Sequence, residues 1–300
     1  MDKIGYISVL FGQENLLQDY FKSIALQSCP VYGIYLIDNS PSAEMMTMVQ
    51  AMKDRYPLLD IKYVQNTRNL GAAKANNKGI QMAIEDGCTA CILSNTDIAY
   101  DDPNLFCEVA RLSAEKNGAI VAPKIYYFGT HKIWYAGGDM VKWKGGVVHY
   151  HDRKEENKAT ETSCFTGYAP TTFLYIPIKT FEEAGLLDEQ YFLYMEDAEW
   201  VHRAGVAGYK IWYAANIHLF HKVSITTGGI LSDLGIYYNT RNRLFFIRQY
   251  FSFFQKLLAA CYIMGSTAYF VLRTWRFSAW RAYFKAIYDG LFTTLKLPHL

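Results

Sequence analysis

The N-terminal third of the chain repeats one pattern: a short apolar run, then a turn, then a segment whose apolar residues have helical spacing. The apolar runs predict strands at residues 4–10, 31–37, 60–65 and 88–93. The spaced segments between them predict helices, the clearest at residues 72–85. Strands that alternate with helices in this way are typical of a doubly wound, mostly parallel α/β sheet.

Each predicted strand after the first ends in a polar cluster that contains Asp or Asn. The clusters lie at residues 38–40, 66–69 and 94–97. Ligands of open α/β sheets bind beyond the carboxyl ends of the strands. Asp97, with the Asn95 amide two residues before it, offers oxygen ligands to a hard divalent cation. The same residues also suit an ordinary turn with a helix cap, so both interpretations stay open at this point.

A basic helix start follows the third predicted strand. Gly71, Lys74 and Lys78 fall in the first two turns of this helix. Backbone amides at a helix N-terminus and a nearby Lys suit a phosphate group. The segment matches neither a Walker A loop nor a GxGxxG fingerprint, and a solvated basic helix face is the alternative interpretation.

The middle of the chain loses this periodicity. Residues 105–116 predict a helix and residues 119–122 a short strand that ends at Pro123. Residues 126–161 predict only an irregular insertion, or small hairpins, over the sheet end. Its ring-bearing side chains include Trp134, Tyr135, Trp143 and His149. These rings could bind a sugar, or they could simply pack the insertion itself.

A cluster of carboxylates follows a further predicted strand at residues 172–176. Glu196, Asp197 and Glu199 begin a predicted helix, where acids are stabilising in their own right. The residues just before them, 191–195, are apolar and aromatic. That sequence places the acids at the edge of a buried site, where a carboxylate can act as a general base.

The C-terminal quarter is basic and aromatic. It follows a strand predicted at residues 209–214 and then His221, which could contact a metal or a phosphate, or neither. From residue 241 to the end there are nine Lys and Arg and one acid, a balance of +8 that leaves −6 for the rest. Such a tail favours an anionic membrane surface over nucleic acid.

The 16 uncharged residues between Lys256 and Arg273 are fewer than the about 20 that span a bilayer. We therefore expect a helix that lies on the inner face of a membrane, so that the protein is peripheral. The alternatives are packing against the rest of the chain or against a second copy in a homodimer, and a true bilayer span.

The composition excludes several classes of protein. The chain has 300 residues, 51% of them hydrophobic, and a net charge of only +2, so it is neither disordered nor a nucleic-acid-binding polycation. We expect a domain at residues 1–225 and a helical extension at 226–300. The six cysteines show no disulfide framework and the N-terminus no signal-peptide pattern, so we expect reduced thiols and a cytoplasmic location. The CxxC at Cys88 leads into a strand, which disfavours a redox or zinc role.

The motifs together carry a resemblance to a known family. They are Asp38-Asn-Ser40, Asn69-Leu-Gly71 with Asn76-Asn-Lys-Gly79, Leu93-Ser-Asn-Thr-Asp97, and the run from Gly185 to Asp197. In their order and spacing the chain resembles, from about Ile4 to Lys222, the family 2 nucleotide-sugar glycosyltransferases of GT-A fold, especially rhamnosyltransferase-like members. The resemblance implies a Rossmann-like catalytic sheet.

The resemblance also implies the roles of individual residues. Nucleotide-sugar binding is expected at Asp38, Asn39, Asn69, Gly71, Lys74, Asn95 and Arg241. Asp97 and His221 would hold a divalent cation, Mn²⁺ or Mg²⁺, and Asn95 replaces the first Asp of the family's DXD-type motif. Asp197, paired with Glu196, would deprotonate the acceptor hydroxyl. The sugar and the acceptor are expected near Trp134, Gly167 and Tyr194.

One base that faces one anomeric carbon implies direct displacement and inversion at that carbon. We therefore expect transfer of a sugar from a dTDP-rhamnose or UDP-hexose type donor to a hydroxyl of a glycan, lipid-linked, in surface polysaccharide synthesis. One alternative is a sugar nucleotidyltransferase, which is disfavoured because the turn at residues 11–15 has one Gly and no basic residue. The other is an inactive glycan-binding subunit of the same fold, disfavoured because Asp97 and Asp197 are both present.

Overall fold

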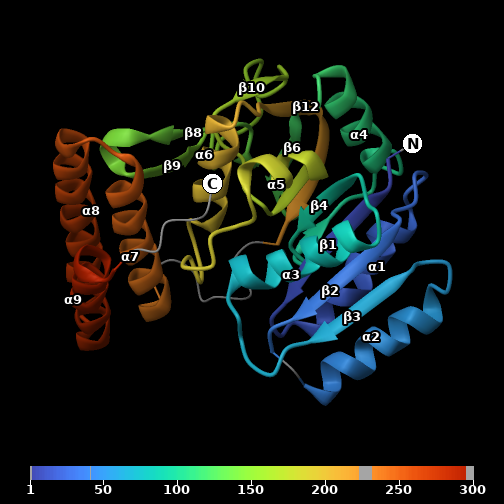
Figure 1. Cartoon of the computed structure of the whole chain (residues 1–300), viewed down its shortest axis with the longest axis horizontal. Helices are drawn as coiled ribbons and strands as arrows, with labels where there is room; N and C mark the ends of the chain where they lie inside the picture. The colour runs from blue at the N-terminus through green and yellow to red at the C-terminus, as the bar shows by residue number, and fades with distance from the viewer. Residues whose placement is uncertain (1, 41, 223–231, 295–300) are drawn as a thin grey trace.

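The computed structural model describes residues 2–40, 42–222 and 232–294, and a ten-stranded sheet forms its centre (Figure 1). The strands of this sheet are β1 (Ile4–Leu10), β2 (Gly33–Asp38), β3 (Ile61–Gln65), β4 (Ala90–Ser94), β5 (Ile98–Ala99), β6 (Ile120–Tyr127), β7 (Ile133–Tyr135), β10 (Cys164–Thr166), β11 (Phe173–Pro177) and β12 (Ile211–His221). The helices are α1 (Leu17–Ala25), α2 (Ala43–Arg55), α3 (Ala72–Glu85), α4 (Leu105–Glu115), α5 (Ile178–Ala184), α6 (Glu196–Val206), α7 (Asp233–Tyr250), α8 (Phe253–Thr274) and α9 (Phe277–Phe292).

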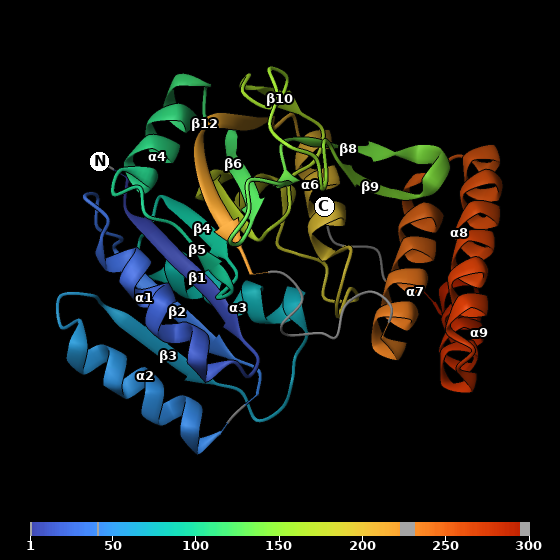
Figure 2. The same ribbon diagram turned by 180° about the vertical axis from the view of Figure 1, so that it is seen from behind.

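Parallel strands in the order β3-β2-β1-β4 form the half of the sheet that the sequence predicts. Helix α3 packs against β1 and β2 on the face turned to the viewer in Figure 1, and α1 lies on the opposite face, seen in Figure 2. The predicted doubly wound α/β architecture is confirmed. Beyond β4 the sheet becomes mixed, because β11 runs antiparallel to both β4 and β6.

Helix α3 approaches the sheet closely, and a glycine makes this approach possible. A Cβ added at Gly79 would lie 2.5 Å from Ile7 Cγ2 of β1, so a larger residue would push the helix away. Strand β1 is almost wholly buried, with its tyrosine and isoleucine side chains in the core. The close packing fixes the start of α3 relative to the carboxyl ends of the strands.

Two strands are longer than predicted. Strand β6 does not end at Pro123 but continues to Tyr127, and β12 continues past Ala214 to His221. The two strands pair in parallel, and Pro123 lies opposite Ala214, where the register of β12 shifts. A proline, which lacks an N–H group, is tolerated at such an irregularity. The extension places His221 at the end of a sheet strand and not in a following loop.

The predicted insertion contains a small hairpin over the sheet end. Strands β8 (Gly138–Val141) and β9 (Gly146–His149) form it, joined by a turn with the short helix η2 (Lys142–Lys144). Its tip reaches the C-terminal helices (Figure 1), where the Arg243 side chain donates to Gly145 O at 3.1 Å. The hairpin therefore connects the central sheet to the C-terminal helices.

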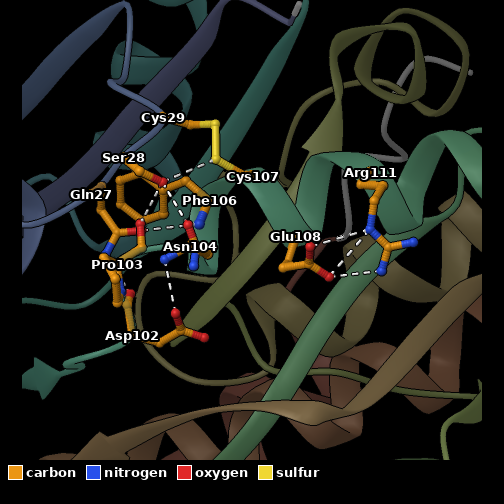
Figure 3. The surroundings of a disulfide bond; sticks show 10 residues. All are labelled: Gln27, Ser28, Cys29, Asp102, Pro103, Asn104, Phe106, Cys107, Glu108 and Arg111. Carbon is orange, nitrogen blue, oxygen red and sulfur yellow. Dashed lines mark hydrogen bonds and ion pairs between the residues drawn. A yellow bond between two sulfur atoms is a disulfide. The ribbon is translucent and has the colours of Figure 1, made fainter.

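The prediction that the cysteines are all reduced is wrong. Cys29, after α1, forms a disulfide with Cys107 of α4 (Figure 3). Polar contacts hold the same two segments together, including donation from the Gln27 amide to Asp102 O at 2.8 Å. The 78-residue separation of the two cysteines gives no spacing signal in the sequence. The fold, which brings the end of α1 beside α4, creates the pair.

The C-terminal helices differ in how they join the molecule. Helix α7 contributes Leu244, Phe246 and neighbouring residues to the main hydrophobic core, and α8 adds Ala259 and Ile263. Helix α9 packs on α7 (Figures 1 and 2), and its Ala279 and Tyr283 belong to a second, smaller cluster. The predicted domain boundary at 225/226 lies outside the described residues. Within residues 2–40, 42–222 and 232–294, none of the helices combines the length and apolar character that crossing a bilayer requires.

Candidate functional site

Two strand ends bring Asp97 and His221 together. The two-residue strand β5 pairs antiparallel with the end of β12, so that Ile98 lies opposite His221. This pairing puts Asp97 Oδ2 3.2 Å from His221 Nε2, and both side chains are buried. The Lys222 N–H donates to the Asp97 carbonyl at 2.7 Å and fixes the backbone there.

The Asp97 Oδ2 and His221 Nε2 atoms that face each other are of the ligand types that bind divalent cations. Among the described residues, Asp97 Oδ1 and His221 Nδ1 are buried without a hydrogen-bond partner. A carboxylate oxygen and an imidazole nitrogen are ligands that Mn²⁺ accepts. The described residues contain no cluster of three or more His, Cys, Asp or Glu suited to a metal. The remaining ligands would have to be phosphate oxygens and water, the usual arrangement for Mg²⁺ at a phosphate site.

Aromatic contacts extend from His221 across the insertion. Trp134 of β7 packs edge-on against His221, with ring centroids 4.5 Å apart, and against His149 of β9 at 4.7 Å. The His149 Nδ1 lies 2.9 Å from Trp134 O, and its ring stacks on Tyr168. Burial lowers the pKa of His149, which keeps its imidazole neutral at neutral pH.

The Asp197 carboxylate is held at the other end of this chain of contacts. Tyr168 Oη donates to Asp197 Oδ2 at 2.6 Å, and the Ala198 N–H donates to Oδ1 at 2.7 Å. Burial, and then the charge of Asp197, raise the pKa of Tyr168 well above its usual range. The phenol therefore stays protonated and acts as the hydrogen-bond donor. A run of contacting side chains thus links Asp97 to Asp197.

The two carboxyl groups at the start of α6, Glu196 and Asp197, both have raised pKa values. Burial, and then the charge of Asp197, raise the pKa of Glu196 to about 8. Burial also raises the pKa of Asp197, while the Tyr168 hydrogen bond acts in the opposite direction. Glu196 Oε2 is buried and has no hydrogen-bond partner in the described parts of the chain. At neutral pH Asp197 is therefore the better candidate for a base, and Glu196 carries a proton.

The predicted nucleotide contact Asp38 lies at the carboxyl end of β2 and is fully buried. Tyr63 Oη donates to Asp38 Oδ2 at 2.6 Å, and the Ser40 N–H donates to Oδ1 at 2.9 Å. Both carboxylate oxygens therefore have protein partners, and the nucleotide-binding role of Asp38 stays a prediction.

Asn39 is engaged differently, because its amide holds the loop before α3. Its Oδ1 accepts from Asn66 Nδ2 at 3.0 Å, and its Nδ2 donates to Gly71 O at 3.1 Å. Asn69 Oδ1 accepts from the Gly71 N–H at 2.8 Å and tightens the same loop. Lys78 donates to Asn66 Oδ1 at 2.9 Å. These residues shape the helix start at which a phosphate was predicted.

Other predicted site residues have protein partners. Lys74 forms an exposed ion pair with Glu189 at 2.8 Å, and Arg241 of α7 donates to Gln190 O at 2.6 Å.

Asn95 is exposed at the end of β4, beside Asp97. Gly167 is exposed next to Tyr168, and Tyr194 lies just before the acid pair with a left-handed φ of 64°. The third acid, Glu199, forms a buried ion pair with Arg203 and has a structural role.

Comparison with known proteins identifies the family. The profile of Glycosyl transferase family 2 matches residues 7–173, more than half of the chain. The chain belongs to glycosyl transferase family 2. The match includes the ends of β2 and β4, which carry Asp38 and Asp97. The nucleotidyltransferase alternative is therefore set aside.

Similar proteins are distant in sequence. The low-salt glycan biosynthesis hexosyltransferase Agl10 of Haloferax volcanii is 20% identical over 256 residues, which are 84% of this glycosyltransferase and 78% of that protein. Two solved structures share the fold. GalNAc-T7, solved with UDP, GalNAc and Mn²⁺, has a TM-score of 0.66 at 15% identity, over 85% of this chain and 49% of its own. The mannosyltransferase PcManGT of Pyrobaculum calidifontis, solved with GDP-Man and Mn²⁺, has a TM-score of 0.61 at 12% identity, over 96% and 74%.

Sequence reasoning about this glycosyltransferase missed Tyr168 as the partner of Asp197. The two residues are 29 positions apart, and no spacing rule connects them. It also missed Tyr63, which lies on a different strand from the Asp38 it contacts. Asn66 could have been predicted, because it is the first residue of the polar cluster after the third predicted strand.

Proposed function

We propose that this family 2 glycosyltransferase moves a sugar from a nucleotide diphosphate sugar, of the dTDP-rhamnose or UDP-hexose type, to a glycan hydroxyl with inversion. One observation carries the proposal. A chain of contacts runs from Asp97 through His221, Trp134, His149 and Tyr168 to Asp197, and so links the proposed cation site to the proposed base. The relatives solved with Mn²⁺ and a nucleotide or nucleotide sugar support the same donor class.

Asp97 and His221 would hold Mn²⁺ or Mg²⁺, which neutralises the charge that develops on the departing diphosphate. The start of α3, with Gly71, would place backbone N–H groups near the same phosphates. Asp38 would receive the nucleoside. These roles use positions at the carboxyl ends of β2, β3 and β4, where ligands bind in open α/β sheets.

Asp197 would take the proton of the acceptor hydroxyl, which is a poor nucleophile until it is deprotonated. Tyr168 and the Ala198 N–H orient its carboxylate. Glu196, protonated at neutral pH and with one buried oxygen unpartnered among the described residues, would hydrogen-bond the substrate. With a single base at the site, direct displacement inverts the anomeric carbon.

The test is a screen of dTDP, UDP and GDP sugars for Mn²⁺-dependent release of nucleoside diphosphate. Wild type should show slow hydrolysis with at least one donor, and Asp97→Ala should abolish it together with the Mn²⁺-dependent part of donor binding. The product of a transfer reaction, analysed by NMR, should have the opposite anomeric configuration to the donor. No release with any donor would favour the alternative, an inactive glycan-binding subunit.

The acceptor is proposed to be lipid-linked, with the enzyme peripheral on the cytoplasmic face of the membrane, in surface polysaccharide synthesis. Support comes from an apolar stripe along α8, whose exposed positions recur at helical spacing. The stripe includes Phe254, Leu258, Tyr269 and Leu272. At the α8–α9 turn, Trp275 is 93% exposed.

Basic residues occur along the same part of the sequence. They are Lys256, Arg273, Arg276, Arg281 and Lys285. Exposed aromatic side chains next to Lys and Arg fit the interface of an anionic bilayer, where apolar groups insert and cations meet headgroups. Helix α8 itself lies at the end of the molecule away from the central sheet (Figure 1).

Vesicle flotation tests this attachment. The protein should float with phosphatidylglycerol-containing vesicles and much less with pure phosphatidylcholine. A Phe254→Glu/Leu258→Glu variant should lose flotation, while the control Phe165→Glu, at an exposed aromatic of β10, should keep it. If the tail variant instead converts a dimer to a monomer in light scattering and flotation is unchanged, the stripe is a homodimer interface.

A further inference from the structure

The loop that leads into the catalytic pair has an unfavourable backbone. Tyr194 and Met195, just before Glu196, have left-handed φ values of 64° and 69°. Neither is glycine, and such conformations are unfavourable for other residues, so they persist only where the surroundings hold them. Because α6 begins at the next residue, this loop sets where the Asp197 carboxylate points.

A single buried amide of α7 holds this loop. Asn242, fully buried, donates both N–H groups of its side chain, one to Leu193 O and one to Tyr194 O, each at 2.8 Å. Its Oδ1 accepts from Arg241 Nε at 2.8 Å, which fixes the orientation of the amide. The guanidinium of Arg241 donates at the same time to Gln190 O.

The start of α3 contacts the loop as well. The Ala72 N–H donates to Phe192 O at 2.7 Å, and a Cβ added at Gly71 would lie only 2.5 Å from that oxygen. The Phe192 ring stacks on Tyr238 of α7, with centroids 5.1 Å apart and planes 23° from parallel. The loop is therefore clamped between α3, where the donor phosphates are proposed to lie, and α7.

Helix α7 also reaches α6 itself. Tyr250 Oη donates to Glu199 Oε1 at 2.5 Å, and Tyr191 Oη donates to Gln249 Oε1 at 2.6 Å. These contacts fix the first turns of α6 relative to α7, so the helix after the sheet domain supports the catalytic pair along its length.

We propose that Asn242 is a positioning residue, which holds the 190–195 loop in the conformation that aims the Asp197 carboxylate at the acceptor hydroxyl. The inference rests on the proposed function for what Asp197 does, but not for the clamp itself. It assigns to α7 a direct part in the catalytic geometry. A displacement of about 1 Å at a reacting group can reduce the rate about 10²-fold.

The test compares Asn242→Asp with Thr240→Val. Asn242→Asp removes both N–H donors at nearly constant volume, whereas Thr240 is a buried α7 residue whose hydroxyl contacts only Thr267 among the described residues, at 3.4 Å. For Asn242→Asp we expect kcat for nucleoside diphosphate release to fall about 10²-fold with KM for the donor unchanged. Thr240→Val should keep kcat. Tyr238→Leu, at a more accessible position, should show a smaller loss of the same kind.

Hydrogen exchange of the peptide that covers residues 190–199 gives a second readout, which needs no activity. Its protected amides include the Glu199 N–H, which donates to Met195 O. Exchange should become faster in Asn242→Asp and stay at the wild-type rate in Thr240→Val. A wild-type kcat or wild-type exchange in Asn242→Asp overturns the proposal, as does an equal kcat loss in Thr240→Val. If wild type releases no nucleoside diphosphate, the proposed function fails, while exchange still decides on the clamp.

Discussion

Removal of the Tyr168 hydroxyl should move the acidic limb of the enzyme's pH–activity profile to higher pH. Tyr168 donates to the ionised Asp197 at 2.6 Å, and this bond lowers the pKa that burial raises. A hydrogen bond to a charged acceptor contributes about 1.5–3 kcal/mol. One pKa unit corresponds to about 1.4 kcal/mol. Tyr168→Phe should therefore raise the pKa of Asp197 by about one to two units.

The base must be ionised to work, so activity rises with pH through this pKa, and a higher pKa moves the acidic limb to higher pH. The assay is kcat/KM for Mn²⁺-dependent nucleoside diphosphate release, measured across the pH range with the donor found in the screen. Activity of Tyr168→Phe should fall below that of wild type on the acidic limb and approach it as the pH rises. Tyr213→Phe removes another buried phenol, which donates to Thr160 O, and should leave the limb in place. An unmoved limb in Tyr168→Phe would refute the reasoning.

Glu196→Gln should flatten the pH dependence of stability. Burial raises the pKa of Glu196 from 4.5 to about 8, so the folded protein loses stability as the pH rises through this window. The variant should lose less Tm than wild type between these pH values in calorimetry, and parallel curves would contradict the pKa. Asp97→Asn and His221→Ala should each weaken Mn²⁺ binding by at least about tenfold in titrations with a nucleoside diphosphate present, and unchanged affinity would reject the cation site. Cys29→Ser removes the disulfide to Cys107 and should cost about 2–4 kcal/mol. Its Tm should fall by about 5–10 °C and match the Tm of wild type with the disulfide reduced. A variant Tm equal to that of oxidised wild type would contradict this prediction.

Local patterns predicted the first half of the sheet well. Strand β1 and helix α3 match their predicted bounds, because buried parallel strands read as apolar runs and α3 has a clear helical period. The strand after α4 was cut short because Pro123 reads as a terminator. Only its position beside the irregularity of β12 lets the strand continue, and that is a tertiary fact.

The residues of the candidate site also fall into those that local sequence predicts and those that depend on tertiary contacts. Residues at strand ends, such as Asp38 and Asp97, follow from the rule that ligands bind at carboxyl ends of strands. Residues that act by positioning another residue cannot be predicted from this rule. Tyr168 and Asn242 meet the catalytic segment only because the insertion and α7 pack around α6, and the disulfide of Cys29 arises from the same kind of tertiary proximity.

The central claim is that one site binds the donor at Asp97 and activates the acceptor at Asp197. Asp197→Asn tests it most directly, since the amide keeps the Tyr168 hydrogen bond and cannot accept a proton. Titration of the variant with the donor and Mn²⁺, alongside a transfer assay, separates the two functions. The account predicts wild-type donor affinity with transfer abolished. Normal transfer by Asp197→Asn would contradict it.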